Sequence, residues 1–461
     1  MIFSSPIFVF GFLPAFLAVY YAAPKAIRSL IILIGSYAFY GWWRIDYLAL
    51  IFGMSLVSYI AAEVAHKRGS VWAVRLGVTF DLAVLGYFKY TMFIMSGLSD
   101  LSVALGGADV TVPSIILPIG ISFHTFQSIS YIIDVSRKDA PPARNLIDFL
   151  AFGSLFPQLI AGPVLRYKDL ADQFANRVHS PAIFLQGMAR FAQGLAMKLL
   201  IADNVAPLAD RVFAATAPTA AEAWLGAGAY SIQLLFDFAG YSAMAIGLGL
   251  MIGFRFIENF NAPYRSQSIT EFWRRWHISL SHWLRDYLYL PLGGNRRGKV
   301  RTYINLTLTM VLGGLWHGAN WTFIVWGAWH GLWLAIERAL GAKTRGSVWP
   351  KPLAWVMTMI IVMLGWVVFR AQSLGEAMNV YLGMAGVNGW SISASMGWQI
   401  QPTEMAALLI GFILSVAGRE IAQALRTLPA MVRGTGQAAL LGVACLALVA
   451  QTHSPFLYFQ F

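Results

Sequence analysis

Long apolar runs separated by short polar segments dominate the pattern of this sequence. Most runs approach the roughly 20 residues that an α-helix needs to cross a bilayer. They do not alternate apolar and polar positions, as the strands of a membrane β-barrel would. The pattern predicts an all-α, polytopic integral membrane protein with about 11 transmembrane helices. The apolar runs lie at about 7–22, 27–43, 47–65, 74–95, 112–135, 183–201, 230–254, 301–338, 353–369, 405–417 and 438–450.

The composition supports a membrane protein. Of 461 residues, 58% are hydrophobic and only 12% are charged, whereas water-soluble domains have about 25% charged residues. Without an internal repeat or a low-complexity linker, we expect a single domain over residues 1–461. Cys445 is the only cysteine, so a disulfide within the chain and a metal cluster of thiolates are excluded.

The basic residues indicate an orientation in the membrane. Lys and Arg favour every second loop among the first five runs, at residues 23–28, 66–75 and 136–145. Cytoplasmic loops carry such an excess. We therefore expect these loops in the cytoplasm, and the N-terminus and the loop at 97–111 on the other face. The net charge of +12 then reflects topology, and no nucleic-acid partner is predicted; the expected partner of the apolar runs is the lipid bilayer.

Two segments depart from simple spans. Residues 156–163 read F-P-Q-L-I-A-G-P, which predicts a broken or re-entrant helix or, alternatively, an ordinary kinked one. Residues 166–181 read as a polar loop. Residues 255–301 are basic and expected in the cytoplasm. There Ser268 and Glu271 fit a capping box, followed by one amphipathic interfacial helix with Arg274 on its polar side.

The stretch 301–338 reads as membrane helix throughout, yet it contains His317. An ionisable residue inside a membrane span is a functional-site hypothesis by default, although a histidine in a helix contact is the alternative. Glycines in this stretch should allow close helix approach. Asp237, in another apolar run, needs a partner, for which Arg265, Arg274 and the histidines are candidates.

The remaining histidines divide into groups. His277 lies beside the aromatic face of the amphipathic helix and is the second candidate for chemistry. His282 and His330 sit among tryptophans and are expected to pack at helix contacts, and His124 could line a cavity. Neither H-x-x-x-H nor H-E-x-x-H occurs, so no metal site is predicted.

Three motifs resemble the membrane-bound O-acyltransferase family. They are F-W-R-R-W-H-I-S-L-S at 272–281, W-L-R-D-Y-L-Y-L-P-L-G-G-N-R-R-G at 283–298 and G-G-L-W-H-G-A-N-W at 313–321. E-N-F-N-A-P-Y at 258–264 also matches. The resemblance extends along the whole chain and is closest to the bacterial polysaccharide branch, of which alginate O-acetyltransferase is typical.

The resemblance implies a ring of membrane helices around a central cavity in the inner membrane. It places the active-site histidine at His317 and a second characteristic histidine at His277. Substrate-binding candidates near these motifs are Asp237, Trp276, Arg274, Asn320 and Trp316. Near Asp237 the sequence departs from the family pattern, because Ala239 and Ala243 replace a serine and an acid.

The implied reaction is acyl transfer from a cytoplasmic thioester, such as acetyl-CoA, towards an acceptor on the other face. No tightly bound cofactor is expected. Histidine suits the role of general base at neutral pH, so His317 is predicted to be the base, with His277 positioning or polarising the thioester. A separate periplasmic acetyltransferase is the expected partner protein.

Other readings stay open. A transporter or flippase could use His317 and Asp237 in its pathway, although the repeated halves typical of transporters are not visible. A non-catalytic scaffold would leave His317 unexplained. Within the acyltransferase reading, the acceptor could be alginate, cellulose, another exopolysaccharide or peptidoglycan.

Overall fold

The computed structural model describes residues 1–160, 162–341 and 349–450, and over these residues it contains helices and no strands. Six described helices are long and apolar enough to cross a membrane, which confirms the predicted all-α, multi-pass membrane architecture. The expected number of about 11 spans is not confirmed. The six are α3 (Asp46–Arg68), α4 (Val71–Ala104), α11 (Ala220–Met251), α17 (Lys351–Arg370), α20 (Pro402–Arg426) and α21 (Ala430–Ala450).

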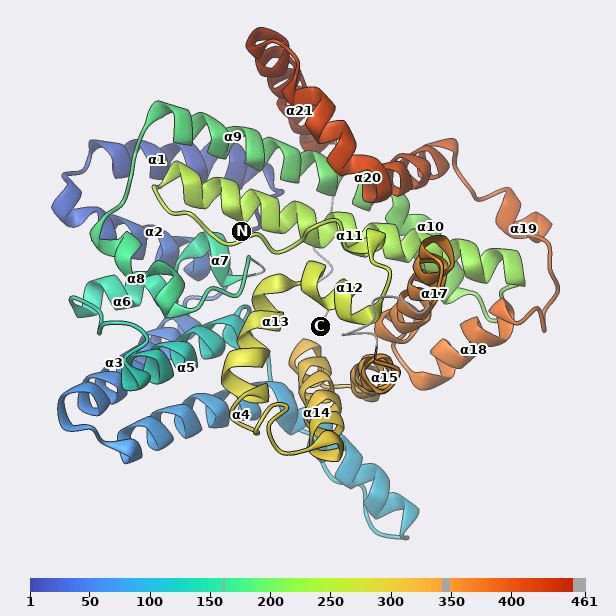
Figure 1. Ribbon diagram of the computed structural model, residues 1–461, viewed down its shortest axis with the longest axis horizontal. Helices are drawn as coiled ribbons and strands as arrows, with labels where there is room; N and C mark the ends of the chain where they lie inside the picture. The colour runs from blue at the N-terminus through green and yellow to red at the C-terminus, as the bar shows by residue number, and fades with distance from the viewer. Residues whose placement is uncertain (161, 342–348, 451–461) are drawn as a thin grey trace. The chain divides into compact units, whose positions relative to one another are not determined.

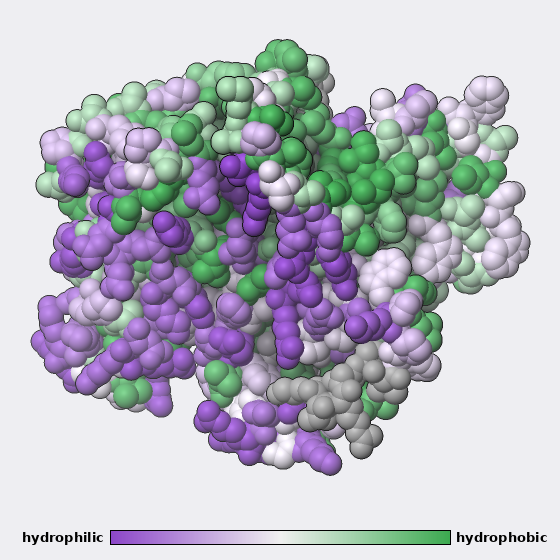
Figure 2. Space-filling model, turned by 45° about the horizontal axis from the view of Figure 1, so that its top comes forward, coloured by the Kyte–Doolittle hydropathy of each residue, from purple (hydrophilic) through white to green (hydrophobic). Residues whose placement is uncertain are grey.

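Exposed apolar side chains mark the membrane-facing surface of these helices. Leu409 and Phe412 on α20 are 60% and 50% exposed, and Leu446 on α21 is 73% exposed. In Figure 2, hydrophobic residues gather in broad areas of the visible face, beside areas of hydrophilic residues. In a bilayer the lipid covers such apolar areas, so they need no protein partner.

The chain divides into two compact units. Unit 1 contains residues 1–191 and 244–257, and unit 2 contains residues 192–243 and 258–461. Beside α3 and α4, unit 1 contains α1 (Leu13–Ala22), α2 (Arg28–Gly41), α5 (Ile121–Arg137), α6 (Leu146–Gly153), α7 (Phe156–Leu159), α8 (Tyr167–Ala175) and most of α9 (Pro181–Ala196). Helices α3, α4 and α5 pack against one another, as Figure 1 shows.

The predicted run at 112–135 is helical only from Ile121 onwards, in α5. Gly120 precedes this helix with a φ of +76°, and a side chain there would collide with the carbonyl oxygen of Leu159. Glycine is tolerated in this left-handed conformation because it lacks a Cβ atom. The expected loop at 97–111 is shorter than predicted, since α4 continues to Ala104.

The predicted break at 156–163 is confirmed. Helix α6 ends at Gly153, and α7 is a single turn with Pro157 near its start. The Phe156 N–H donates to Ser36 Oγ at 3.1 Å, and Gln158 Nε2 donates to the Phe152 carbonyl at 2.9 Å. The Ser36 side chain and the last turn of α6 therefore accept hydrogen bonds from the Phe156 N–H and the Gln158 amide where the helix is interrupted.

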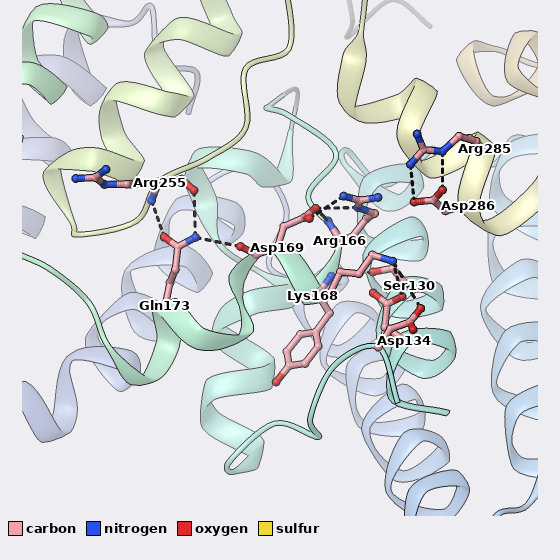
Figure 3. A network of polar contacts seen from close by, with 11 residues as sticks. Ser130, Asp134, Arg166, Lys168, Asp169, Gln173, Arg255, Arg285 and Asp286 are labelled. Atoms are coloured by element: carbon pink, nitrogen blue, oxygen red, sulfur yellow. Dashed lines mark hydrogen bonds and ion pairs between the residues drawn. The ribbon is translucent and has the colours of Figure 1, made fainter. Parts of the chain in front are cut away.

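The prediction of a polar loop at 166–181 was wrong for its first half, which forms α8. Asp169 accepts from the backbone N–H of Arg166 at 3.2 Å and from its Nε at 2.9 Å. Further along, Gln173 exchanges two hydrogen bonds with the backbone of Arg255 (Figure 3). These local bonds stabilise α8. Because the overall hydrophobicity of this helix is low, the apolar pattern did not predict it.

Unit 2 begins with the end of α9, the π-helix Met197–Ala202, α10 (Asp203–Ala214) and most of α11. Then follow α12 (Ile269–Arg275), α13 (Ile278–Leu284), α14 (Lys299–His317), α15 (Trp321–Ala339), α17, α18 (Leu374–Met384), α19 (Ala394–Gly397), α20 and α21. The predicted runs at 353–369, 405–417 and 438–450 correspond to α17, α20 and α21, the last two longer than expected.

The stretch 301–338 is not one continuous helix, which corrects the prediction. It forms an antiparallel hairpin of α14 and α15, which lie side by side in Figure 1. The glycines allow the close approach that was expected: a Cβ atom at Gly327 would lie 2.8 Å from Val311 Cα, and one at Gly331 would lie 2.8 Å from Thr307 Cα. His317 is therefore the last residue of a helix, beside the turn of the hairpin.

The predicted amphipathic helix after Ser268 is also interrupted. Its start is as expected, because Ser268 Oγ accepts from the Glu271 N–H at 3.0 Å. Glu271, however, accepts from the N–H of Gln267 and not from that of Ser268. The helix then stops at Arg275 and resumes at Ile278. The interruption places His277 in a tight turn.

Candidate functional site

His317 lies in an enclosure of aromatic rings in unit 2. Its side chain is buried, with the residue 5% exposed. Its ring centroid is 5.0 Å from Trp316, 5.2 Å from Trp326 and 5.2 Å from Phe369. Three elements contribute these rings, namely α14, α15 and α17. An imidazole in such surroundings is shielded from water.

His277 comes close to His317 although the two are far apart in the sequence. Their ring centroids are 6.3 Å apart. Trp316 contacts both, at 5.9 Å from His277, and Phe238 of α11 packs edge-on against His277 at 4.8 Å. The structure thus brings together the two histidines that the sequence marked, together with Trp316.

A left-handed backbone conformation aims the His277 side chain. Its φ is +43° and its ψ is 53°, a region that residues other than glycine seldom adopt. Such a conformation persists only where the surrounding structure enforces it. Here the turn is held by Asn259, whose backbone carbonyl accepts from the Ile278 N–H at 3.0 Å.

Asn259 also holds His277 through its side chain, although it was not among the predicted site residues. The residue is fully buried. Its Oδ1 lies 3.2 Å from His277 Nδ1, 2.8 Å from Ser279 Oγ and 3.3 Å from Ser279 N. Asn259 belongs to the E-N-F-N-A-P-Y motif at 258–264, which was used only as evidence of the family resemblance.

The protonation state of His277 follows from its burial. Desolvation lowers its pKa to about 3, because an imidazolium loses its hydration when it is buried without an anionic partner. His277 is therefore neutral at physiological pH. A neutral imidazole has one nitrogen that donates and one that accepts.

Asp237 has a partner that was not among the predicted ones. In unit 2 it forms an ion pair with Lys198 at 2.8 Å, and Lys198 is also 2.6 Å from Asp203. Arg265 instead pairs with Glu420. Lys198 could have been found by the rule applied to Asp237, since it is one of two charged residues, with Arg190, in the apolar run at 183–201.

The remaining predicted site residues have different surroundings. Trp276 is buried 4.9 Å from Trp366 and 5.0 Å from Phe260, and so belongs to the neighbouring aromatic packing. The Asn320 side chain caps α15 by accepting from the Thr322 N–H, and it donates to the Gln372 carbonyl. Arg274 is exposed. The structure does not bring Asn320 or Arg274 into contact with the two histidines.

Two other histidines have packing roles. His330 is fully buried, 5.0 Å from Trp326 and 5.3 Å from Trp273, which confirms the expected helix contact. His124, in unit 1, lies 2.9 Å from the Gly153 carbonyl through Nδ1 and 3.3 Å from Ser55 Oγ through Nε2. Both of its nitrogens thus have partners within the protein.

The described residues contain no group of three or more His, Cys, Asp or Glu side chains that could hold a metal ion. The imidazole rings of the paired histidines supply acid–base and hydrogen-bonding chemistry.

Comparison with known proteins identifies the family. Residues 136–375, which include both histidines, match the model of the MBOAT, membrane-bound O-acyltransferase family. The chain is 51% identical to the probable alginate O-acetylase AlgI of Pseudomonas putida over the full length of both proteins. It is 54% identical to that of Pseudomonas aeruginosa, over 90% of this chain and 80% of the relative. It is also 37% identical to the peptidoglycan O-acetyltransferase of Helicobacter pylori, over 85% and 81%. This chain therefore belongs to the membrane-bound O-acyltransferase family, and it is a multi-pass integral membrane O-acyltransferase.

Proposed function

We propose that this protein transfers an acetyl group from a cytoplasmic thioester across the membrane for O-acetylation of an exopolysaccharide. Alginate is the favoured polymer, because the full-length relatives at about half identity bear the name alginate O-acetylase. A peptidoglycan O-acetyltransferase is more distant at 37% identity.

The observation that carries this proposal is the pair of buried histidines in an aromatic enclosure, with ring centroids 6.3 Å apart. In the proposed step, His317 accepts the proton of the attacking hydroxyl as its oxygen bonds to the thioester carbonyl carbon. The carbon–sulfur bond breaks, and the thiolate leaves and takes up a proton. A well-placed general base accelerates such a reaction about 10²–10⁴-fold. In this step His277 positions the donor.

The proposal includes a location and partners. The protein would lie in the bacterial inner membrane with its N-terminus in the periplasm, as the alternation of basic loops indicates. The donor would be acetyl-CoA or another acyl thioester, which binds from the cytoplasm. A separate periplasmic acetyltransferase would receive the acetyl group and modify the polymer.

The test measures transfer of labelled acetyl from acetyl-CoA by protein purified into nanodiscs. His317→Asn keeps a polar side chain of similar size but has no useful basicity. We expect this variant to fold and to lose on the order of 10²-fold or more in transfer rate. Rates are normalised to folded protein by size-exclusion chromatography.

His330→Asn is the matched control, since His330 is a buried histidine in the adjoining aromatic packing. If His317→Asn retained activity within a few-fold of wild type, or if both variants lost activity equally, the general-base role would be rejected. Parallel incubation with alginate and peptidoglycan acceptors, in the presence of the periplasmic partner, identifies the polymer.

A further inference from the structure

The bonding around Asn259 determines which atom of its amide faces His277. The atom assigned as Oδ1 lies 3.3 Å from the backbone nitrogen of Ser279, in a geometry in which that N–H donates to it. A backbone N–H can only donate a hydrogen bond. The amide must therefore present its oxygen here, because the NH₂ group would bring two donors together.

This oxygen in turn determines the tautomer of His277. Nδ1 lies 3.2 Å from Asn259 Oδ1, and two acceptors at this distance would repel each other. Nδ1 must therefore carry the hydrogen. The competing arrangement has Ser279 Oγ donate to Nδ1, but that distance is 3.5 Å, whereas Oγ is 2.8 Å from Asn259 Oδ1. The shorter distance favours donation from the Ser279 hydroxyl to Asn259.

The other ring nitrogen then has a lone pair and no protein partner. His277 Nε2 is buried and has no hydrogen-bond partner among the described residues. The rings that contact His277 include those of Phe238, Trp316 and His317. A buried acceptor without a donor destabilises the folded protein, so such an atom beside a candidate site points to a bound donor group.

We infer that Asn259 is a positioning residue that fixes His277 in the Nδ1–H tautomer, so that Nε2 accepts a hydrogen bond from a substrate N–H or O–H group. This inference rests on the proposed function and refines it. An acceptor nitrogen cannot donate to the thioester carbonyl oxygen, so His277 does not polarise the thioester. The bound group is either an amide N–H of the pantetheine arm of the donor or the hydroxyl that attacks.

The tautomer can be tested without any assay of transfer. Protein labelled with ¹⁵N-histidine in nanodiscs is examined by solid-state NMR, and the His277 signals are identified by their loss in His277→Gln. We expect a neutral ring protonated at Nδ1 in wild type and in Asn259→Asp. In Asn259→Leu, which removes the acceptor, Nε2–H should become populated. A wild-type ring protonated at Nε2 would overturn the inference.

Kinetics separate positioning from a purely structural role. Because a carboxylate next to Nδ1–H favours the charged imidazolium, Asn259→Asp should raise the pKa of His277 and move the acid limb of the pH–rate profile upward. Asn259→Leu should lower kcat/KM about 10–100-fold, the usual effect of losing a partner that orients a functional histidine. An unchanged pH profile in Asn259→Asp, or unchanged kcat/KM in Asn259→Leu, would contradict the inference.

The same data distinguish the two sources of the bound group. A higher KM for acetyl-CoA with little change in kcat identifies the donor arm, whereas a lower kcat at unchanged KM identifies the hydroxyl.

Asn305→Leu is the control, because Asn305 is also a buried asparagine but donates to the carbonyls of Leu292 and Gly294, in the turn before α14. If Asn305→Leu lowered kcat/KM as much as Asn259→Leu does, the positioning role would be rejected. A wild-type protein with the Nδ1–H tautomer but no acetyl transfer would refute the proposed function alone.

Discussion

At the scale of single residues, backbone conformation and burial decide what each histidine can do. His277 sits in a left-handed turn and His317 at the last residue of a helix. Neither lies within a regular helical segment, where a side chain direction follows directly from periodicity. His330, by contrast, lies within α15 and packs as its helical position suggests. The difference in surroundings among these buried histidines thus arises from local geometry.

The low pKa of His277 predicts how protein stability depends on pH. An unfolded histidine has a pKa of about 6.5, and burial lowers that of His277 to about 3. Between these values the unfolded chain binds more protons, so stability falls as the pH falls from about 6.5 towards 3. Between pH 7 and pH 5 this amounts to about 2 kcal/mol.

Thermal unfolding in detergent at pH 7 and pH 5 measures this contribution. His277→Gln lacks the ionisable ring, so we expect it to lose less stability than wild type over this interval. An equal loss in the two proteins would show that other groups cause the acid sensitivity.

At the scale of elements, the hairpin of α14 and α15 determines the position of His317. The hairpin is tight because glycines face backbone atoms of the opposite helix, as Gly327 faces Met310 and Val311. Close backbone approach through small residues is a general means of packing helices in membranes. The turn places His317 beside Trp326 of the second helix, so helix spacing and site geometry are coupled.

Gly327→Ala should therefore disturb both stability and activity. The added methyl group would lie 2.8 Å from Val311 Cα, and it must push the two helices apart. Overpacking of this kind costs about 1–3 kcal/mol. We expect a lower melting temperature and a lower transfer rate in the folded fraction, measured with the nanodisc assay.

Gly442→Ala is the matched control within a helix, because no atom lies within 4 Å of the added methyl group. It should leave both quantities unchanged. If Gly327→Ala behaved in the same way, the hairpin spacing would not be what positions His317.

At the scale of the whole molecule, topology links the site to its substrates. The proposed reaction requires that the donor enter from the cytoplasm and that the acetyl group leave on the other face. The basic segment at 255–301, which carries His277, is expected in the cytoplasm. The orientation of the chain is therefore the property on which the proposed direction of transfer depends.

Labelling of single cysteines from outside the cell tests this orientation. In a Cys445→Ala background, we expect a membrane-impermeant thiol reagent to modify Leu105→Cys and to spare Arg297→Cys. Both positions are exposed, with Leu105 79% exposed at the end of α4, so a lack of reaction reports the side of the membrane. After permeabilisation both should react. The opposite pattern would reverse the topology and refute a cytoplasmic donor.

Much of the architecture follows from the sequence because hydrophobicity and helix breaking are local properties. The apolar runs predicted the long helices, the F-P-Q-L-I-A-G-P segment at 156–163 predicted the break after α6, and the glycines at 313–327 predicted a close helix contact. The motifs identified the family and singled out His277 and His317. What the apolar pattern could not show was where a run folds back, so the hairpin at 301–338 and the turn at His277 were both read as continuous helix.

The pairings of distant side chains were decided only by the tertiary structure. Asp237 was known to need a partner, but Lys198 became that partner because of how its helix packs against α11. Likewise, Asn259 reaches His277 only because the chain between them folds back into a left-handed turn. Sequence patterns indicate which face of a helix is apolar, but many different helices could pack against that face. Which of them meet depends on helix packing and on turns, and these fix the hydrogen bonds that give a histidine its tautomer.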